Sequence, residues 1–161
     1  MIDLPIDIVR SERRKATLQA SVVAGTIRVQ VPAGMPEEEE RRRVEELVAK
    51  VRRTMEAGTV DLVARASALA RRLDLPEPKE ISWSARQNSR WGSCTPSRGA
   101  IRISNRLASV PGFVLDYVLV HELAHLRVAG HGRAFEALVG RYELAERARG
   151  YLMALNQTGA I

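Results

Sequence analysis

Residues 111–131 of this 161-residue chain read PGFVLDYVLVHELAHLRVAGH. Pro111 is typical of the first turn of a helix, and the residues after it are apolar almost all round, up to about Ala129. A helix that is apolar on every face belongs inside a protein. We therefore expect residues 111–129 to form the central helix of the fold.

Three ionisable residues interrupt this apolar helix: His121, Glu122 and His125. Residues four apart lie on one face of a helix, so the two imidazoles can bind one zinc ion at about 2.0–2.1 Å. Glu122 can then act as a general base toward the zinc-bound water without binding the zinc itself. The histidines could instead be hydrogen-bonded core residues. Burying them unpaired would cost several kcal/mol, so we favour a metal site.

A third zinc ligand has two kinds of candidate. His131 follows His125 by six residues and has a glycine on each side, which lets the chain turn back toward the metal. Zinc hydrolases with this motif also use a glutamate further along the chain, and Glu143 and Glu146 lie at a suitable separation. We favour His131.

Short runs of alternating apolar residues predict strands in two parts of the chain. Residues 6–31 contain several such runs separated by short turns, which predicts an antiparallel meander. Three further strands are expected at 81–85, 90–94 and 100–104.

Apolar stripes at helical spacing predict three more helices, at residues 36–58, 59–73 and 133–153. The first begins with Pro36 and four glutamates, which complement the helix dipole. Because only a short segment separates the first two helices, we expect them to form a hairpin. The mixture of strands and helices predicts an α+β fold in a single domain, with antiparallel strands, a helical hairpin and a central zinc-binding helix.

The composition favours a cytoplasmic protein. No apolar stretch is long enough to span a membrane, and the start of the chain lacks the order of a signal peptide. Cys94 is the only cysteine, which excludes an internal disulfide and fits a reducing compartment. The net charge of +6 comes mainly from arginine, which prefers planar anions. An anionic ligand is therefore reasonable, although scattered arginines more often form surface ion pairs.

One further set of residues supports a family resemblance. It comprises Trp83, Arg86, the run Ser89–Cys94, the strand Ile101–Ile103 with Asn105 and Leu107, the helix residues Asp116–Leu126, and His131, Gly132, Phe135 and Leu138. With this set the chain resembles the YgjP-like metallopeptidases, which are related to the SprT-like zinc proteases. The amino-terminal strands fit the same family more weakly.

The resemblance implies a zincin-like domain over residues 1–161, with amino-terminal strands at 1–32, helices at 36–73 and a catalytic core at 80–155. It also implies a Zn²⁺ cofactor, three histidine ligands and one catalytic glutamate. These map onto His121, His125, His131 and Glu122.

Residues near the motif have open roles. Arg90 and Trp91 are candidates for substrate binding; alternatively, Trp91 packs on the metal-binding helix and Arg90 pairs with Asp116. Asn105 and Asp116 could hold the free N–H of a histidine. We expect Cys94 to be a small buried residue, because a fourth protein ligand would close the catalytic position.

The function predicted first is a zinc metallopeptidase that cleaves a peptide or protein held along a sheet edge. An alternative is a nucleoside-triphosphate pyrophosphohydrolase that uses the same metal-activated water. A third possibility is a nucleic-acid-associated protease like the SprT-like relatives, although no basic and aromatic stripe supports it.

Overall fold

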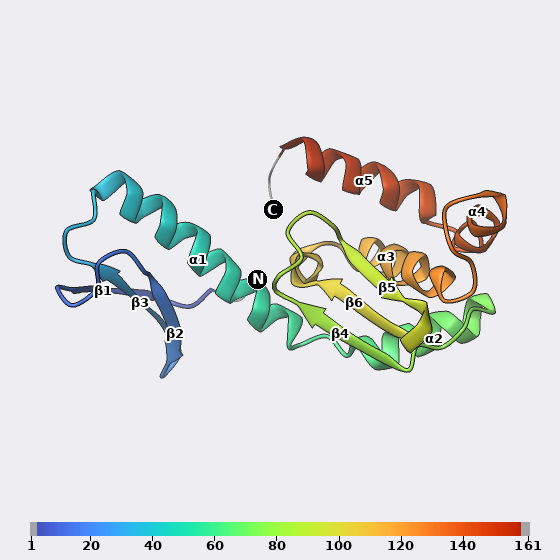
Figure 1. Ribbon diagram of the computed structural model, residues 1–161, viewed down its shortest axis with the longest axis horizontal. Helices are drawn as coiled ribbons and strands as arrows, with labels where there is room; N and C mark the ends of the chain where they lie inside the picture. The colour runs from blue at the N-terminus through green and yellow to red at the C-terminus, as the bar shows by residue number, and fades with distance from the viewer. Residues whose placement is uncertain (1–2, 159–161) are drawn as a thin grey trace. The chain divides into compact units, whose positions relative to one another are not determined.

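The computed structural model describes residues 3–158, which form an α+β fold, as predicted (Figure 1). In chain order the elements are β1 (Ile6–Ser11), β2 (Gln19–Val23), β3 (Thr26–Pro32), α1 (Glu37–Ala57), α2 (Leu62–Leu73), β4 (Glu80–Ser84), β5 (Gly92–Thr95), β6 (Ala100–Ser104), α3 (Gly112–His125), α4 (Arg133–Val139) and α5 (Ala145–Thr158). Short 3₁₀ turns at Pro96–Arg98 and Asn105–Ser109 flank β6.

The chain divides into two compact units, one up to Glu56 and one from Ala57 onward. Each unit has its own core of buried residues. The single-domain organisation over residues 1–161 stays a prediction, and residues 1–2 and 159–161 of that range lie outside the described residues.

In the first unit, β3 is the central strand of a sheet with the order β1-β3-β2. Its residues Ile27, Val29 and Val31 are completely buried. Val44 and Val48 of α1 belong to the same buried cluster, so α1 covers one face of this sheet. The helix forms because its apolar residues recur at helical spacing, while its other face is charged.

The predicted antiparallel meander is wrong. β2 pairs with β3 in antiparallel register through the turn at Ala24-Gly25, but β1 pairs with β3 in parallel. The reason lies in the apolar pattern: β3 buries every second side chain completely, whereas Ile6, Ile8 and Val22 of the neighbouring strands stay about 40–45% exposed. The most apolar strand takes the centre, where both of its edges are hydrogen-bonded.

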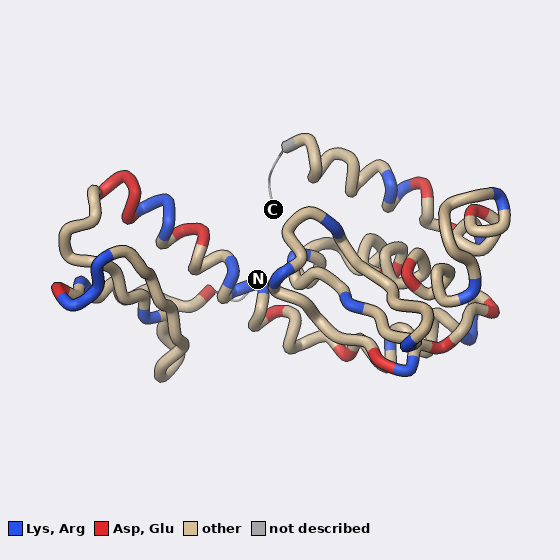
Figure 2. The backbone as a smooth tube through the Cα atoms, viewed as in Figure 1, with Lys and Arg blue, Asp and Glu red and all other residues tan. Residues whose placement is uncertain are grey.

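The charged run at the start of α1 is mostly solvated, as predicted, but Glu40 is buried and pairs with Arg10 of β1 at 2.6 Å. Figure 2 shows acidic and basic blocks following one another along this helix. They form the surface ion pairs Glu38–Arg41, Glu39–Arg43 and Arg42–Glu46. Such exposed pairs contribute at most about 1 kcal/mol each.

The second unit contains a sheet with the order β4-β6-β5. β4 runs parallel to β6, and β5 pairs with β6 in antiparallel register. The three strands lie close to their predicted positions, and only the β5–β6 pair has the predicted antiparallel direction. The register places Trp83, Ile103 and Gly92 in one row across the sheet.

α3 packs against α2, α4, α5 and the second sheet. Its completely buried residues include Val114, Leu119, Val120, Leu123 and Ala124. Fully burying one such aliphatic side chain contributes about 1.5–3 kcal/mol, which explains the interior position of the helix. α3 ends at His125, four residues before the predicted end.

One other prediction about the helices needs correction. The predicted helix at residues 133–153 is two helices. α4 ends at Val139, before Gly140, and the chain then turns inward at Tyr142, whose hydroxyl donates to the Phe113 carbonyl at 3.1 Å. α1 and α2 form near their predicted bounds, and their buried residues belong to different cores. The hairpin of these two helices stays a prediction.

None of the helices in the described residues is both long enough and apolar enough to cross a membrane.

Candidate metal centre

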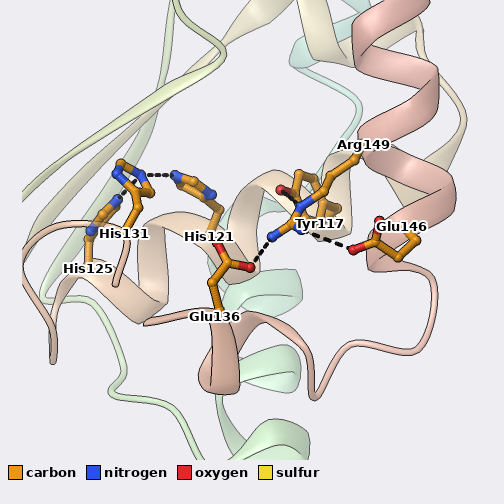
Figure 3. A network of polar contacts seen from close by, with 7 residues as sticks. All are labelled: Tyr117, His121, His125, His131, Glu136, Glu146 and Arg149. Carbon is orange, nitrogen blue, oxygen red and sulfur yellow. Dashed lines mark hydrogen bonds and ion pairs between the residues drawn. The ribbon is translucent and has the colours of Figure 1, made fainter. Parts of the chain in front are cut away.

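The last turn of α3 carries His121, Glu122 and His125. After the helix ends, Gly130 adopts a left-handed conformation with φ of 78°, which reverses the chain direction. His131 follows immediately and returns to the two helical histidines (Figure 3). A non-glycine residue at position 130 would be strained in this turn.

The three imidazoles converge through their Nε2 atoms. The Nε2 atom of His131 lies 3.2 Å from that of His125 and 3.2 Å from that of His121. Two nitrogens bound to one zinc ion at tetrahedral angles and about 2.0–2.1 Å lie about 3.3 Å apart. Within residues 3–158, this is the one group of three or more metal-ligating side chains whose ligand atoms converge, all within 4.8 Å.

The protonation of the histidines suits metal binding. Nδ1 of His125 lies 3.2 Å from the Val128 carbonyl oxygen. A carbonyl can only accept a hydrogen bond, so Nδ1 donates, and in the neutral ring this leaves the electron pair on Nε2 for a metal. Burial, followed by the neighbouring His125 and His131, lowers the pKa of His121 to about 4, so this imidazole is neutral at physiological pH.

Phe135 of α4 packs against all three imidazoles. Its ring is completely buried, stacks on His125 at 4.4 Å between ring centroids, and meets His121 and His131 edge-on at 4.8 and 4.7 Å. Phe135 is one of the residues that carry the family resemblance, and the sequence did not indicate that its ring contacts all three histidines. No spacing rule would have revealed it, because the contact depends on the angle between α3 and α4.

Glu122 points into a confined space beside β5. Its side chain is only 6% exposed, and burial raises the pKa of its carboxyl to about 7, opposed by the nearby positive charge of Arg90. A Cβ atom added at Gly92 would lie 2.7 Å from Oε1 of Glu122. Glycine at this position therefore leaves the room that the carboxylate occupies.

Arg90 and Trp91 precede β5 and differ in their surroundings. Arg90 is exposed and close enough to Glu122 to influence its charge. Trp91 is partly buried against the core, and the guanidinium of Arg106 lies 4.1 Å from the centre of its ring. Cys94 is half-buried, and burial raises the pKa of its thiol to about 11.

Asp116 does not pair with Arg90, which corrects one of the two alternatives given above. Its Oδ1 atom accepts a hydrogen bond from Nε of Arg65 at 2.6 Å. This aspartate therefore ties α3 to α2. Asn105 is buried at 5% exposure, and its role in supporting a histidine stays a prediction.

The two glutamates considered as rival ligands lie outside the histidine cluster. Glu143 is exposed, and Glu146 accepts a hydrogen bond from Nη1 of Arg149 at 3.0 Å. Arg149 also contacts Glu136 and Tyr117 (Figure 3). The sequence did not single out this network, because its members come from three separate helices.

The model of the YgjP-like metallopeptidase domain family matches residues 52–149, which is more than half of the chain. No curated protein and no solved structure matches the sequence.

Proposed function

This chain belongs to the YgjP-like metallopeptidase family, and we propose that it is a zinc-dependent peptidase with His121, His125 and His131 as metal ligands and Glu122 as general base. The cluster of three imidazole nitrogens supports this proposal more than any other observation. Nitrogens spaced at 3.2 Å fit a tetrahedral zinc ion, and three protein ligands leave the fourth position open for the reaction.

The chemistry divides between the metal and the protein. When bound by the three histidines, zinc would supply Lewis acidity, which lowers the pKa of water to about 7 and polarises a substrate carbonyl. Glu122 accepts a proton from the attacking water and can return it to the leaving amine. Its buried position beside Gly92 limits the directions in which the carboxylate can move, so the proton acceptor is held in place before substrate binds.

The proposed peptide site lies along β5. This strand is at the edge of its sheet, and its first residue, Gly92, is next to Glu122. An extended peptide can add to a free sheet edge through main-chain hydrogen bonds, which would bring its backbone beside the metal ligands. Arg90 is proposed to bind a negatively charged group of the substrate, and Trp91 to support the loop that carries Arg90.

An assay that compares substrate classes tests this proposal. Purified protein with added zinc is incubated with a dye-labelled unfolded protein and, separately, with nucleoside triphosphates. We expect cleavage of the unfolded protein that a chelator abolishes and zinc restores. Hydrolysis of triphosphates alone would contradict the peptidase proposal and favour pyrophosphohydrolase activity. The Glu122→Gln variant is the control for contaminating hydrolases, since its metal site is intact.

The same assay addresses a nucleic-acid-associated protease. Single-stranded DNA added to the unfolded-protein reaction should leave the rate unchanged under the proposal made here. A stimulation that depends on DNA would favour the third functional class instead.

A further inference from the structure

Phe135 links the metal centre to α4. The ring contacts all three imidazoles at centroid distances between 4.4 and 4.8 Å. A gap of only about 0.5–1 Å removes roughly a quarter to a half of the attraction between packed atoms. A small shift of α4 would therefore loosen the packing that orients the three histidine rings.

α4 is too short to hold its position without contacts to the rest of the protein. It contains seven residues, and Gly132 and Gly140 stand at its two ends. A helix of this length is unstable in isolation, so its position depends on contacts with the rest of the protein. Phe135, Leu138 and Val139 anchor its buried side, while Glu136 lies on its exposed side.

Arg149 of α5 binds the exposed side of α4 through Glu136. Its Nη2 atom donates to Oε2 of Glu136 at 2.5 Å, and its Nε atom donates to the hydroxyl of Tyr117 at 2.9 Å. Tyr117 lies one turn before His121 on α3, with 6.2 Å between the two ring centroids. One guanidinium thus connects α3 and α4 on the side of His121 (Figure 3).

These contacts contribute little to the free energy of unfolding of the whole protein. The side chains of Arg149 and Glu136 are 33% and 48% exposed, and ion pairs this accessible to water contribute little to folding stability. The planar guanidinium, however, fixes the directions of its bonds, which a flexible ammonium would not do. The hydrogen bonds of Arg149 therefore affect the positions of the helices that they join more than they affect folding stability.

We propose that Arg149 is a positioning residue for the metal centre: by holding Glu136 it fixes α4, and through Phe135 it fixes the orientation of the three histidine ligands. This inference rests on the proposed zinc site and deepens it. Neither Arg149 nor Glu136 is proposed to bind the metal or the substrate.

The test measures zinc affinity and folding stability separately. Zinc dissociation constants come from competition with a chromogenic chelator, and the melting temperature is measured on metal-free protein. Arg149→Met and Glu136→Ala should each weaken zinc binding by about tenfold, the lower end of the range for residues that orient metal ligands. The double variant should be no weaker than either single variant, because both changes break one connection.

Glu146→Gln is the matched control. Glu146 also pairs with Arg149, but it lies on the same helix and its side chain is 86% exposed, so zinc affinity should not change. If Arg149→Met fails to fold, Glu136→Ala still tests the proposal, because it removes only an exposed carboxylate.

Three results would overturn the inference. The variants could lower the melting temperature yet keep zinc affinity within twofold, which would make the network purely structural. The two single effects could multiply in the double variant, which would show that Arg149 does not act through Glu136. Finally, the protein without any substitution could fail to bind zinc. This result would refute the metal site itself and would differ from the first two results.

Discussion

Gly92→Ala is a small change with a large expected effect on Glu122. The added Cβ would lie 2.7 Å from Oε1 and 2.9 Å from Cγ of that side chain. An ordinary contact begins at 3.4 Å, so Oε1 must move by about 0.7 Å, or β5 must move away. Because Glu122 is only 6% exposed, neither shift is free of cost. Overpacking of this kind typically costs about 1–3 kcal/mol of stability.

The expected effect on catalysis follows from the displacement. A misplacement of about 1 Å can lower a rate by roughly 10²-fold, so we expect kcat on the unfolded-protein substrate to fall by about 10- to 100-fold. Zinc content should stay unchanged, because the three atoms nearest to the added Cβ all belong to Glu122, which is not a proposed metal ligand. Gly150→Ala is the control: its Cβ meets nothing within 4 Å and stands on a helix, where alanine stabilises.

Urea unfolding of metal-free protein checks the same reasoning without a substrate. Glu122→Ala removes all three atoms that the new Cβ would meet. In the Glu122→Ala background, Gly92→Ala should lower the free energy of unfolding by less than about 0.5 kcal/mol. An equal cost in both backgrounds, or a Gly92→Ala protein with unchanged kcat, would show that the glycine does not make room for the carboxylate.

Two further sets of substitutions and one measurement of thiol reactivity have defined outcomes. Glu122→Gln should keep its zinc yet lose about 10²- to 10⁴-fold in turnover, because an amide cannot accept a proton; metal content and turnover are measured on one preparation. His131→Ala should lose zinc in elemental analysis while Glu143→Ala and Glu146→Ala keep it, and the reverse pattern would assign a glutamate as third ligand. Because its pKa is raised from 9.0 to about 11, the Cys94 thiol should react with a maleimide at pH 8 about 100-fold more slowly than in urea-unfolded protein, and faster as pH rises. Equal rates in folded and unfolded protein would contradict this.

Local patterns in the sequence predicted the elements of the fold better than their connections. Apolar spacing indicated β3, α1 and α2 because each buries one face. The direction of β1 was predicted wrongly, since alternation gives the faces of a strand and not its partner. The break at Gly140 was missed because the apolar stripe continues on both sides of it.

The candidate site was predicted to the extent that it is local in sequence. His121, Glu122 and His125 lie within one helical turn, and the turn at Gly130 explains how His131 joins them. The contacts of Phe135 with the histidines, of Gly92 with Glu122, and of Arg149 with Glu136 and Tyr117 join different elements. Such contacts depend on packing angles, which no single segment determines.

Zinc stoichiometry tests the proposed metal centre itself. Protein purified without chelator is analysed for bound metals, and chelator-treated protein is titrated with zinc. We predict close to one zinc per chain and loss of that zinc in His121→Ala, because three neutral imidazoles in a tetrahedral arrangement bind zinc tightly. Protein that carries no metal and takes up none on titration would contradict the assignment of His121, His125 and His131 as ligands.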